Sequence, residues 1–161
     1  MDNQQHLYNL AKHVKTAMLV THTKDGGIHA RPMAVAELQK DADAYFSTSI
    51  DSPKIGEIEE NSNVLVTFQS GLQFAVIEGR ASIVRDRAQI DRLWSDDWRL
   101  WFPKGKDDPN LCLLKVSAEQ GEYWDTSGLE GIKFMFESAK ARLAGRTPEK
   151  SENQNAKVKL G

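Results

Sequence analysis

The feature that most constrains the fold is a succession of short segments, rich in β-branched and apolar residues, that each end in a turn signal. The first two segments, residues 16–23 and 28–38, are separated by the sequence KDGG. Asp-Gly tolerates the positive φ angle that a tight hairpin needs. A third segment, residues 44–49, follows a second turn, KDAD. This order predicts an antiparallel meander, because no long helix separates successive strands as a parallel sheet would require.

The rest of the chain extends the same pattern. Two more strands are predicted over residues 64–68 and 73–84, and a final strand pair over residues 111–125, bent at Gln120-Gly121. Apolar residues recur at helical spacing in four other segments, residues 3–15, 53–60, 85–101 and 133–145. About six strands in sequential order, with short helices at the corners, predict a mainly β fold: a closed or nearly closed antiparallel barrel.

Length and charge narrow the class of protein. The chain has 161 residues, enough for one domain, which we place at residues 1–145, followed by a flexible polar tail at residues 146–161. The formal net charge of −2 provides no basic field for nucleic acid. No apolar run has the length of a signal peptide or a membrane span, so we expect a soluble, cytoplasmic protein.

The second predicted strand contains an unusual sequence, HARPM. Alternate residues of a strand share a face, so His29, Arg31 and Met33 are predicted to lie on one side and Pro32 on the other. Proline cannot donate to a strand ladder, and Pro32 therefore marks an edge, a bulge or a stretch of backbone that faces something other than a strand. Two interpretations are open: Arg31 is an anion clamp in a ligand-lining strand, or it is a surface arginine beside an edge proline.

Hydroxyl groups and a cation gather where the third strand meets the next helix, in STSIDSPK. The backbone N–H groups at a helix start are unpaired, and the helix dipole favours an anion there. With Ser47, Thr48, Ser52 and Lys54 close by, and Arg31 on the neighbouring strand, such a site suits a phosphate. The alternative is an ordinary Ser-Pro helix cap with a solvated lysine.

The four tryptophans all fall between Trp94 and Trp124. Clustered aromatic side chains are costly to leave exposed, so Trp98 and Trp101 should pack on the core, on a partner subunit or on a planar ligand. The single cysteine, Cys112, is flanked by leucines and predicts a packed thiol. The histidines are not accompanied by a set of carboxylates, so we expect no metal site.

Five motifs, in this order and spacing, carry a resemblance to a known family: HARPM, SPKIGEIEENSNV, VIEGRA, WFPKGKDDPNL and EYWD. Over roughly residues 5–125 the chain resembles the pyridoxamine 5′-phosphate oxidase-related, FMN-binding split-barrel proteins, and within them the general stress protein 26 group. The resemblance implies a six-stranded split barrel that forms a homodimer. It also implies FMN, or the related flavin FAD, in two clefts at the subunit interface.

The resemblance assigns roles to particular residues. Arg31, Pro32 and Met33 would lie along the isoalloxazine ring and ribityl chain. The phosphate would be held by the region of Ser47, Thr48, Ser52 and Lys54. Strands of the other subunit would bring three side chains near the ring, those of Gln69, Phe74 and Trp124. A covering loop would contribute Trp101, Phe102 and Lys104.

The chain also departs from the authentic oxidases. These carry a second basic residue five positions after the strand arginine, where this chain has Ala36. They also carry an arginine-containing C-terminal signature, which is missing after EYWD. We therefore do not expect oxidation of pyridoxamine phosphate. The resemblance implies a flavin-dependent oxidoreductase with a stress-response role; the alternatives are a non-catalytic flavin-binding or sensing protein, and an interaction protein that uses the tryptophan loop as its partner surface.

Overall fold

The computed structural model describes residues 2–128, 136, 139–145 and 155–161. The helices of this part are α1 (Asn3–Ala11), α2 (Pro53–Glu60) and α3 (Arg87–Leu93), with the 3-10 helices η1 (Asp96–Leu100) and η2 (Gly105–Asp107). The strands are β1 (Thr16–His22), β2 (Ile28–Leu38), β3 (Ala44–Ser49), β4 (Asn63–Ser70), β5 (Gln73–Val84), β6 (Leu111–Asp125) and β7 (Asn155–Lys159).

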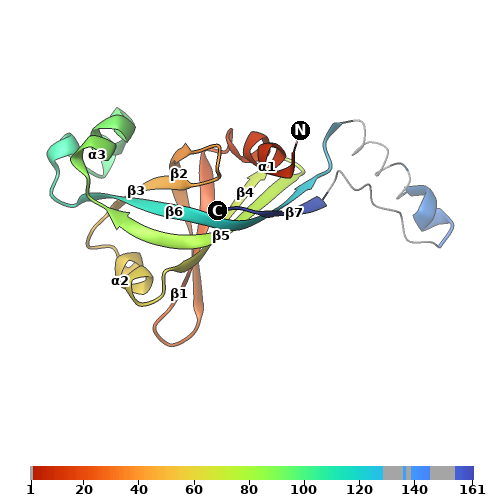
Figure 1. Cartoon of the computed structure of the whole chain (residues 1–161), viewed down its shortest axis with the longest axis horizontal. Coiled ribbons are helices and arrows are strands. Elements are labelled where there is room, and N and C mark those ends of the chain that lie inside the picture. Colours follow the sequence, from red (N-terminus) through yellow and green to blue (C-terminus); the bar gives the residue numbers. More distant parts are fainter. Residues whose placement is uncertain (1, 129–135, 137–138, 146–154) are drawn as a thin grey trace.

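The first six strands close on themselves (Figure 1). The sheet runs in the order β3-β2-β1-β4-β5-β6, and β6 pairs back onto β3 from Ala44↔Val116 to Ser49↔Leu111. Every pairing is antiparallel. The predicted six-stranded antiparallel barrel is confirmed. Because β6 has 15 residues, its second half extends past β3 and carries β7 on the edge that this leaves free.

Two hydrophobic clusters hold the barrel and its surroundings together. The larger fills the barrel with alternate residues of the strands, among them Leu19, Phe46 and Ile77. Helix α1 packs Leu7 onto this cluster at Gly121, where a Cβ atom would lie only 2.5 Å from Leu7 Cδ1. Figure 1 shows α1 and α2 on opposite sides of the barrel.

The smaller cluster lies under α3 and the 3-10 helices, outside the barrel. It buries Trp98 and Phe102 against Tyr45 and Leu113 of the wall. The predicted helix over residues 85–101 is interrupted: α3 ends at Leu93, and Ser95 caps η1 with its hydroxyl group. The break lets the aromatic residues of this segment turn back onto the barrel.

Two predictions near the C-terminus need correction. Residues 111–125 form one long strand, with a bulge opposite Glu78 and Gly79, and not a strand pair. Residues 155–159 of the predicted flexible tail form β7, because Val158 and Leu160 alternate with polar residues and pack into the core. The predicted helix at residues 133–145 falls partly outside the described residues, at 133–135, 137 and 138, although 139–143 are helical. Residues 146–154 also lie outside them.

No helix in the described ranges combines the length and the apolar character that crossing a membrane requires.

Candidate functional site

The barrel wall is open between β2 and β3. These strands pair only between Val35–Leu38 and Ala44–Phe46, and the continuation of β3 from Ser47 to Ser49 pairs with β6 alone. The N–H of Val35 donates to the Lys15 carbonyl on the β1 side (2.9 Å). The backbone nitrogens of successive residues point to opposite edges of a strand. The nitrogen of Pro32, three residues before Val35, therefore faces the opening. A proline there costs the sheet no hydrogen bond, which explains how β2 accommodates it.

A pocket of about 440 Å³ occupies this opening. It is lined by Pro32, Met33, Ala34, Ser47, Thr48, Ser49, Ser52, Lys54, Trp101 and Phe102. Eight of the predicted residues therefore meet in one place: Pro32, Met33, Ser47, Thr48, Ser52, Lys54, Trp101 and Phe102. Trp101 is 66% exposed although it lines the pocket, so much of its side chain is accessible to a ligand.

Lys54 organises the polar end of the pocket. Its ammonium group donates to Thr48 Oγ1 (2.8 Å) and Ser52 Oγ (2.7 Å). Burial lowers the pKa of Lys54, and the nearby cation of Arg31 lowers it further. Each hydroxyl group accepts from Lys54 and so keeps its own proton for a further acceptor. The three groups together form a cradle for an anion.

Ser52 and Pro53 take the predicted cap and first-turn positions of α2, but the serine hydroxyl makes no capping hydrogen bond. Its oxygen accepts from Lys54 instead. Helix α2 therefore begins at the pocket and contributes the positive end of its dipole there.

Arg31 lies beside the pocket and does not line it. Its Nη2 atom donates to Glu57 Oε2 of α2 (2.9 Å), and the two side chains are only 15% and 13% exposed. The other terminal nitrogen, Nη1, is buried and has no hydrogen-bond partner among the residues that the structure describes. A buried donor without an acceptor is costly, so the position suits an additional anionic or carbonyl group.

Glu57 is the functional candidate that the sequence reasoning missed. Its Oε2 atom also accepts from the buried Thr21 hydroxyl (2.5 Å), and His29 Nδ1 lies 3.6 Å from Oε1. The Thr21 hydrogen bond lowers the pKa of Glu57, and Arg31 lowers it further against the effect of burial. Glu57 is therefore ionised at neutral pH. In the sequence it stands in the acidic run EIEEN, which resembles a solvated helix face and gives no signal of this role.

Three predicted residues do not reach the pocket of their own chain. Gln69, Phe74 and Trp124 are neighbours across β4, β5 and β6 in one row of the sheet. Their burial alternates with that of inward residues, so they point away from the barrel interior. Phe74 is 38% exposed.

These residues belong to a wider surface that we call the outer apolar face. The register continues it across β1, β2, β4 and β5, where several outward positions are apolar and Thr67 lies between Met18 and Val76. Its apolar members are Met18, Val20, Ala30, Pro32, Leu65, Phe74, Val76 and Trp124. An apolar surface of this kind is typical of a protein interface.

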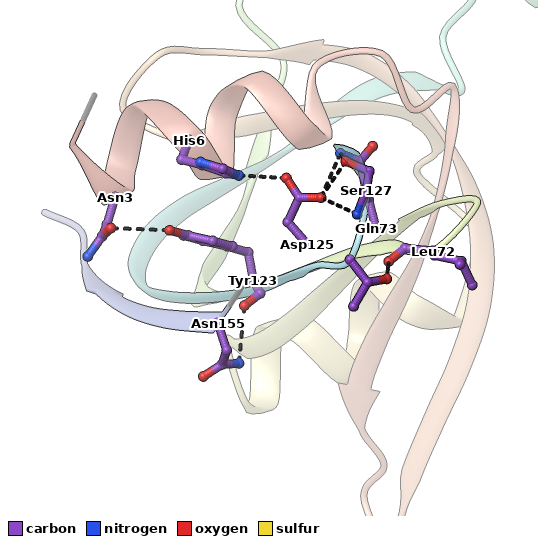
Figure 2. Close-up of polar contacts among 9 residues, drawn as sticks. Asn3, His6, Leu72, Gln73, Tyr123, Asp125, Ser127 and Asn155 are labelled. Carbon is purple, nitrogen blue, oxygen red and sulfur yellow. Dashed lines mark hydrogen bonds and ion pairs between the residues drawn. The ribbon is translucent and has the colours of Figure 1, made fainter. Parts of the chain in front are cut away.

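A second polar cluster ties α1 to the end of β6 (Figure 2). Asp125 accepts from Gln73 Nε2 (3.1 Å), the Ser127 hydroxyl (2.6 Å) and the Ser127 N–H (3.0 Å), and it pairs with His6 Nε2 (2.8 Å). Burial raises the pKa of Asp125, but these bonds outweigh it and hold the pKa at about 2. His6 also stacks on Tyr123, with ring centroids 4.5 Å apart. The cluster fastens the helix that covers the barrel.

Other reactive groups are not assembled into sites in the described ranges. No group of three His, Cys, Asp or Glu side chains there is placed to hold a metal ion. Cys112 is buried beside Thr48, and burial raises the pKa of its thiol. It is a packed thiol, as its leucine neighbours predict.

Comparison with known proteins agrees with the sequence motifs. A family model described as "Pyridoxamine 5′-phosphate oxidase like" matches residues 2–149. General stress protein 26 of Bacillus subtilis (strain 168) is 32% identical over 123 residues, which cover 73% of this chain and 85% of that protein.

Solved structures of general stress proteins are also similar to this chain. General stress protein 26 from Bacillus anthracis str. Sterne has a TM-score of 0.69 at 27% identity, and the match covers 76% of this chain and 94% of that one. The general stress FMN/FAD binding protein from Xanthomonas citri has a TM-score of 0.66 at 33% identity, covering 78% and 92%.

Proposed function

Because the chain belongs to the pyridoxamine 5′-phosphate oxidase-like family, we propose that it binds a flavin nucleotide, FMN or FAD, in the pocket between β2 and β3. The observation that carries the proposal is the cradle formed by Lys54 with the hydroxyl groups of Thr48 and Ser52. A general stress protein that is 33% identical is described as FMN/FAD binding.

The residues present fit such a ligand. The cradle and the start of α2 would hold the phosphate, where charge-assisted hydrogen bonds are strongest. Met33 and the exposed indole of Trp101 supply apolar walls for a flat ring. The buried Nη1 atom of Arg31 is a donor without an acceptor within the described part of the chain. A bound flavin would supply hydride or electron transfer, and this chain would orient it and exclude water from one face.

The site is completed in a homodimer under this proposal. Gln69, Phe74 and Trp124 point outward, away from the pocket of their own chain, and lie on the outer apolar face. If two copies pair through this face, each would cover the pocket of the other. Such an arrangement explains why a large aromatic side chain, Phe74, stands on the outside of the barrel.

We further propose a redox protein with a role in stress that does not oxidise pyridoxamine phosphate. Ala36 stands where the authentic oxidases have a basic residue, so a second phosphate-bearing substrate would lack a partner there. Among the residues lining the pocket, Lys54 is the one ionisable group apart from hydroxyls. The pocket thus offers little acid–base chemistry, which also fits a flavin-binding protein without turnover.

The test is a titration of the purified protein with FMN and FAD, followed by flavin and tryptophan fluorescence. We expect saturation at one flavin per chain, with quenching of both signals. Absence of saturable binding to either flavin would refute the proposal. Reduction of the bound flavin by NADH or NADPH, followed by reoxidation, would identify a redox protein, and absence of both would favour the binding protein.

A further inference from the structure

We propose that Glu57 is a specificity-determining residue that weakens the preference of the phosphate cradle for a doubly charged phosphomonoester over a singly charged phosphate. The inference rests on the proposed function, since the phosphate belongs to the flavin. With such a residue, one pocket would accept both a flavin that ends in a phosphate and one that continues through a diphosphate.

The first step is the charge balance around the cradle. Two cations, Lys54 and Arg31, are close enough that Arg31 lowers the pKa of Lys54. Arg31 is already neutralised by Glu57 through a buried ion pair at 2.9 Å. Lys54 lines the pocket and donates hydrogen bonds to two neutral hydroxyl groups, which leave its charge unbalanced. The cradle therefore presents the charge of about one cation, although the sequence supplies two.

The second step is the charge of the ligand. A terminal phosphomonoester is close to a dianion at neutral pH, because its second pKa is about 6. Each phosphorus of a diphosphate bridge carries less charge, because one more of its oxygens is esterified or bridging. The field of Glu57 acts on the phosphate in proportion to that charge. A fixed carboxylate beside the cradle therefore penalises the phosphomonoester more than the bridge.

The third step concerns the position of Glu57, which the surrounding groups hold in place. Thr21 donates to it from the barrel interior, Arg31 pairs with it, His29 lies beside it at the surface, and Lys54 is the cation on its own helix. A carboxylate held by so many donors cannot swing away when an anion enters. Its charge is a permanent part of the site.

The experiment measures FMN, FAD and riboflavin dissociation constants for the full chain and for Glu57→Gln. Glutamine keeps an oxygen for Thr21 and Arg31 and removes the charge. We expect FMN to bind about tenfold more tightly, FAD about threefold and riboflavin unchanged, so that the FMN-to-FAD preference rises about threefold. An unchanged preference, or an equal change for all three ligands, would overturn the proposal and leave Glu57 a structural residue.

Matched variants separate charge from structure. Glu59→Gln removes the same charge from an exposed position two residues along α2 and should leave the preference as it is. Glu57→Asp retains the charge and should also leave the FMN-to-FAD preference unchanged. Glu57→Met is a second neutral replacement, and either neutral variant that folds decides the question. If neither folds, Glu57 serves the fold and the specificity proposal is wrong.

Failure of the proposed function is distinguishable from failure of this inference. If the unmodified protein binds neither flavin, the same variants are titrated with inorganic phosphate and with dimethyl phosphate, followed by tryptophan fluorescence. Glu57→Gln should then favour inorganic phosphate over the singly charged diester, relative to Glu59→Gln. Equal responses of these two variants would overturn the role of Glu57 independently of any flavin.

Discussion

Lys54 illustrates how a single residue can define a site. It stands two residues after a serine at a helix start, and its ammonium group turns back to the hydroxyl groups of Thr48 and Ser52. Holding a half-buried cation there without a bound anion is unfavourable, as the lowered pKa of Lys54 indicates. An entering phosphate would relieve this cost.

We predict that Lys54→Met weakens FMN binding by about ten- to a hundredfold, because charge-assisted hydrogen bonds contribute about 1.5–3 kcal/mol. Riboflavin, which lacks the phosphate, should bind both proteins with similar affinity. Fluorescence titration with the two ligands measures this. Equal losses for FMN and riboflavin would place Lys54 outside the phosphate site.

Asp125 makes a second prediction at this scale, on stability. Its pKa is about 2 in the folded protein against an ordinary value of 3.8, so its stabilising contribution is present above pH 3.8 and is lost as the pH falls through 2. The shift corresponds to about 2 kcal/mol. We expect Asp125→Asn to be less stable than the unmodified protein by about this amount at pH 7, with the difference shrinking below about pH 4.

Urea unfolding at several pH values between 7 and 3 measures the contribution of Asp125. Glu59→Gln is the control, since this exposed carboxylate should add little at any pH. A difference between Asp125→Asn and the unmodified protein that stays constant down to pH 3 would mean that the side chain acts through its shape and not through its charge.

At the scale of the elements, the separation of β2 from β3 creates the pocket. Beyond their short pairing at Val35–Leu38 and Ala44–Phe46, each strand keeps its ladder on one side only, β2 with β1 and β3 with β6. The proline faces the opening, where no hydrogen bond is lost. The proline in HARPM predicts an edge, a bulge or a stretch of backbone that does not face a strand. The structure shows that β2 does not pair with β3 at this position.

The prediction at this scale concerns the packing of β7 and of Leu160, which follows it. Leu160 is 3% exposed and packs near Gly121 and Leu7, whereas Lys159 next to it is exposed. We expect Leu160→Ala to lower the free energy of unfolding by about 2–4 kcal/mol and Lys159→Ala to change it little. Urea unfolding of both variants checks this. Equal effects would mean that β7 does not dock on β6 in solution.

At the scale of the whole molecule, the outer apolar face is a surface that the single chain leaves uncovered. Its apolar residues stand where an isolated barrel would gain from polar ones. A second copy of the chain would bury them and bring Gln69, Phe74 and Trp124 to the neighbouring pocket. Assembly and flavin binding would then depend on the same residues.

We predict that Phe74→Glu converts a dimer to monomers and weakens FMN binding at least about tenfold, because a charge would be buried at the interface. Leu143→Glu is the matched control, since Leu143 is a 93% exposed apolar residue that is not a member of this face. Sedimentation equilibrium and flavin titration measure the two effects. A Phe74→Glu variant that stays dimeric with full affinity would exclude this face as the interface.

Much of this protein is predictable from the sequence alone. The Asp-Gly turn, the alternating strand segments and their sequential order predict a closed antiparallel barrel, because side-chain periodicity and turn chemistry are local properties. The hydroxyl groups and Lys54 predict an anion site for the same reason: they stand within eight residues of one another, at a helix start. The order and spacing of the five motifs also predict the family to which the chain belongs.

Only the tertiary structure decided the rest. Glu57 in α2 accepts a hydrogen bond from Thr21 of β1 and forms an ion pair with Arg31 of β2. No local sequence pattern reveals that these three segments meet. Residues 155–160 look like a polar tail until β6 supplies the edge for β7 and the core accepts the side chains of Val158 and Leu160. In both cases the deciding interactions join residues far apart in sequence, and their energy depends on burial, which exists only once the chain has closed.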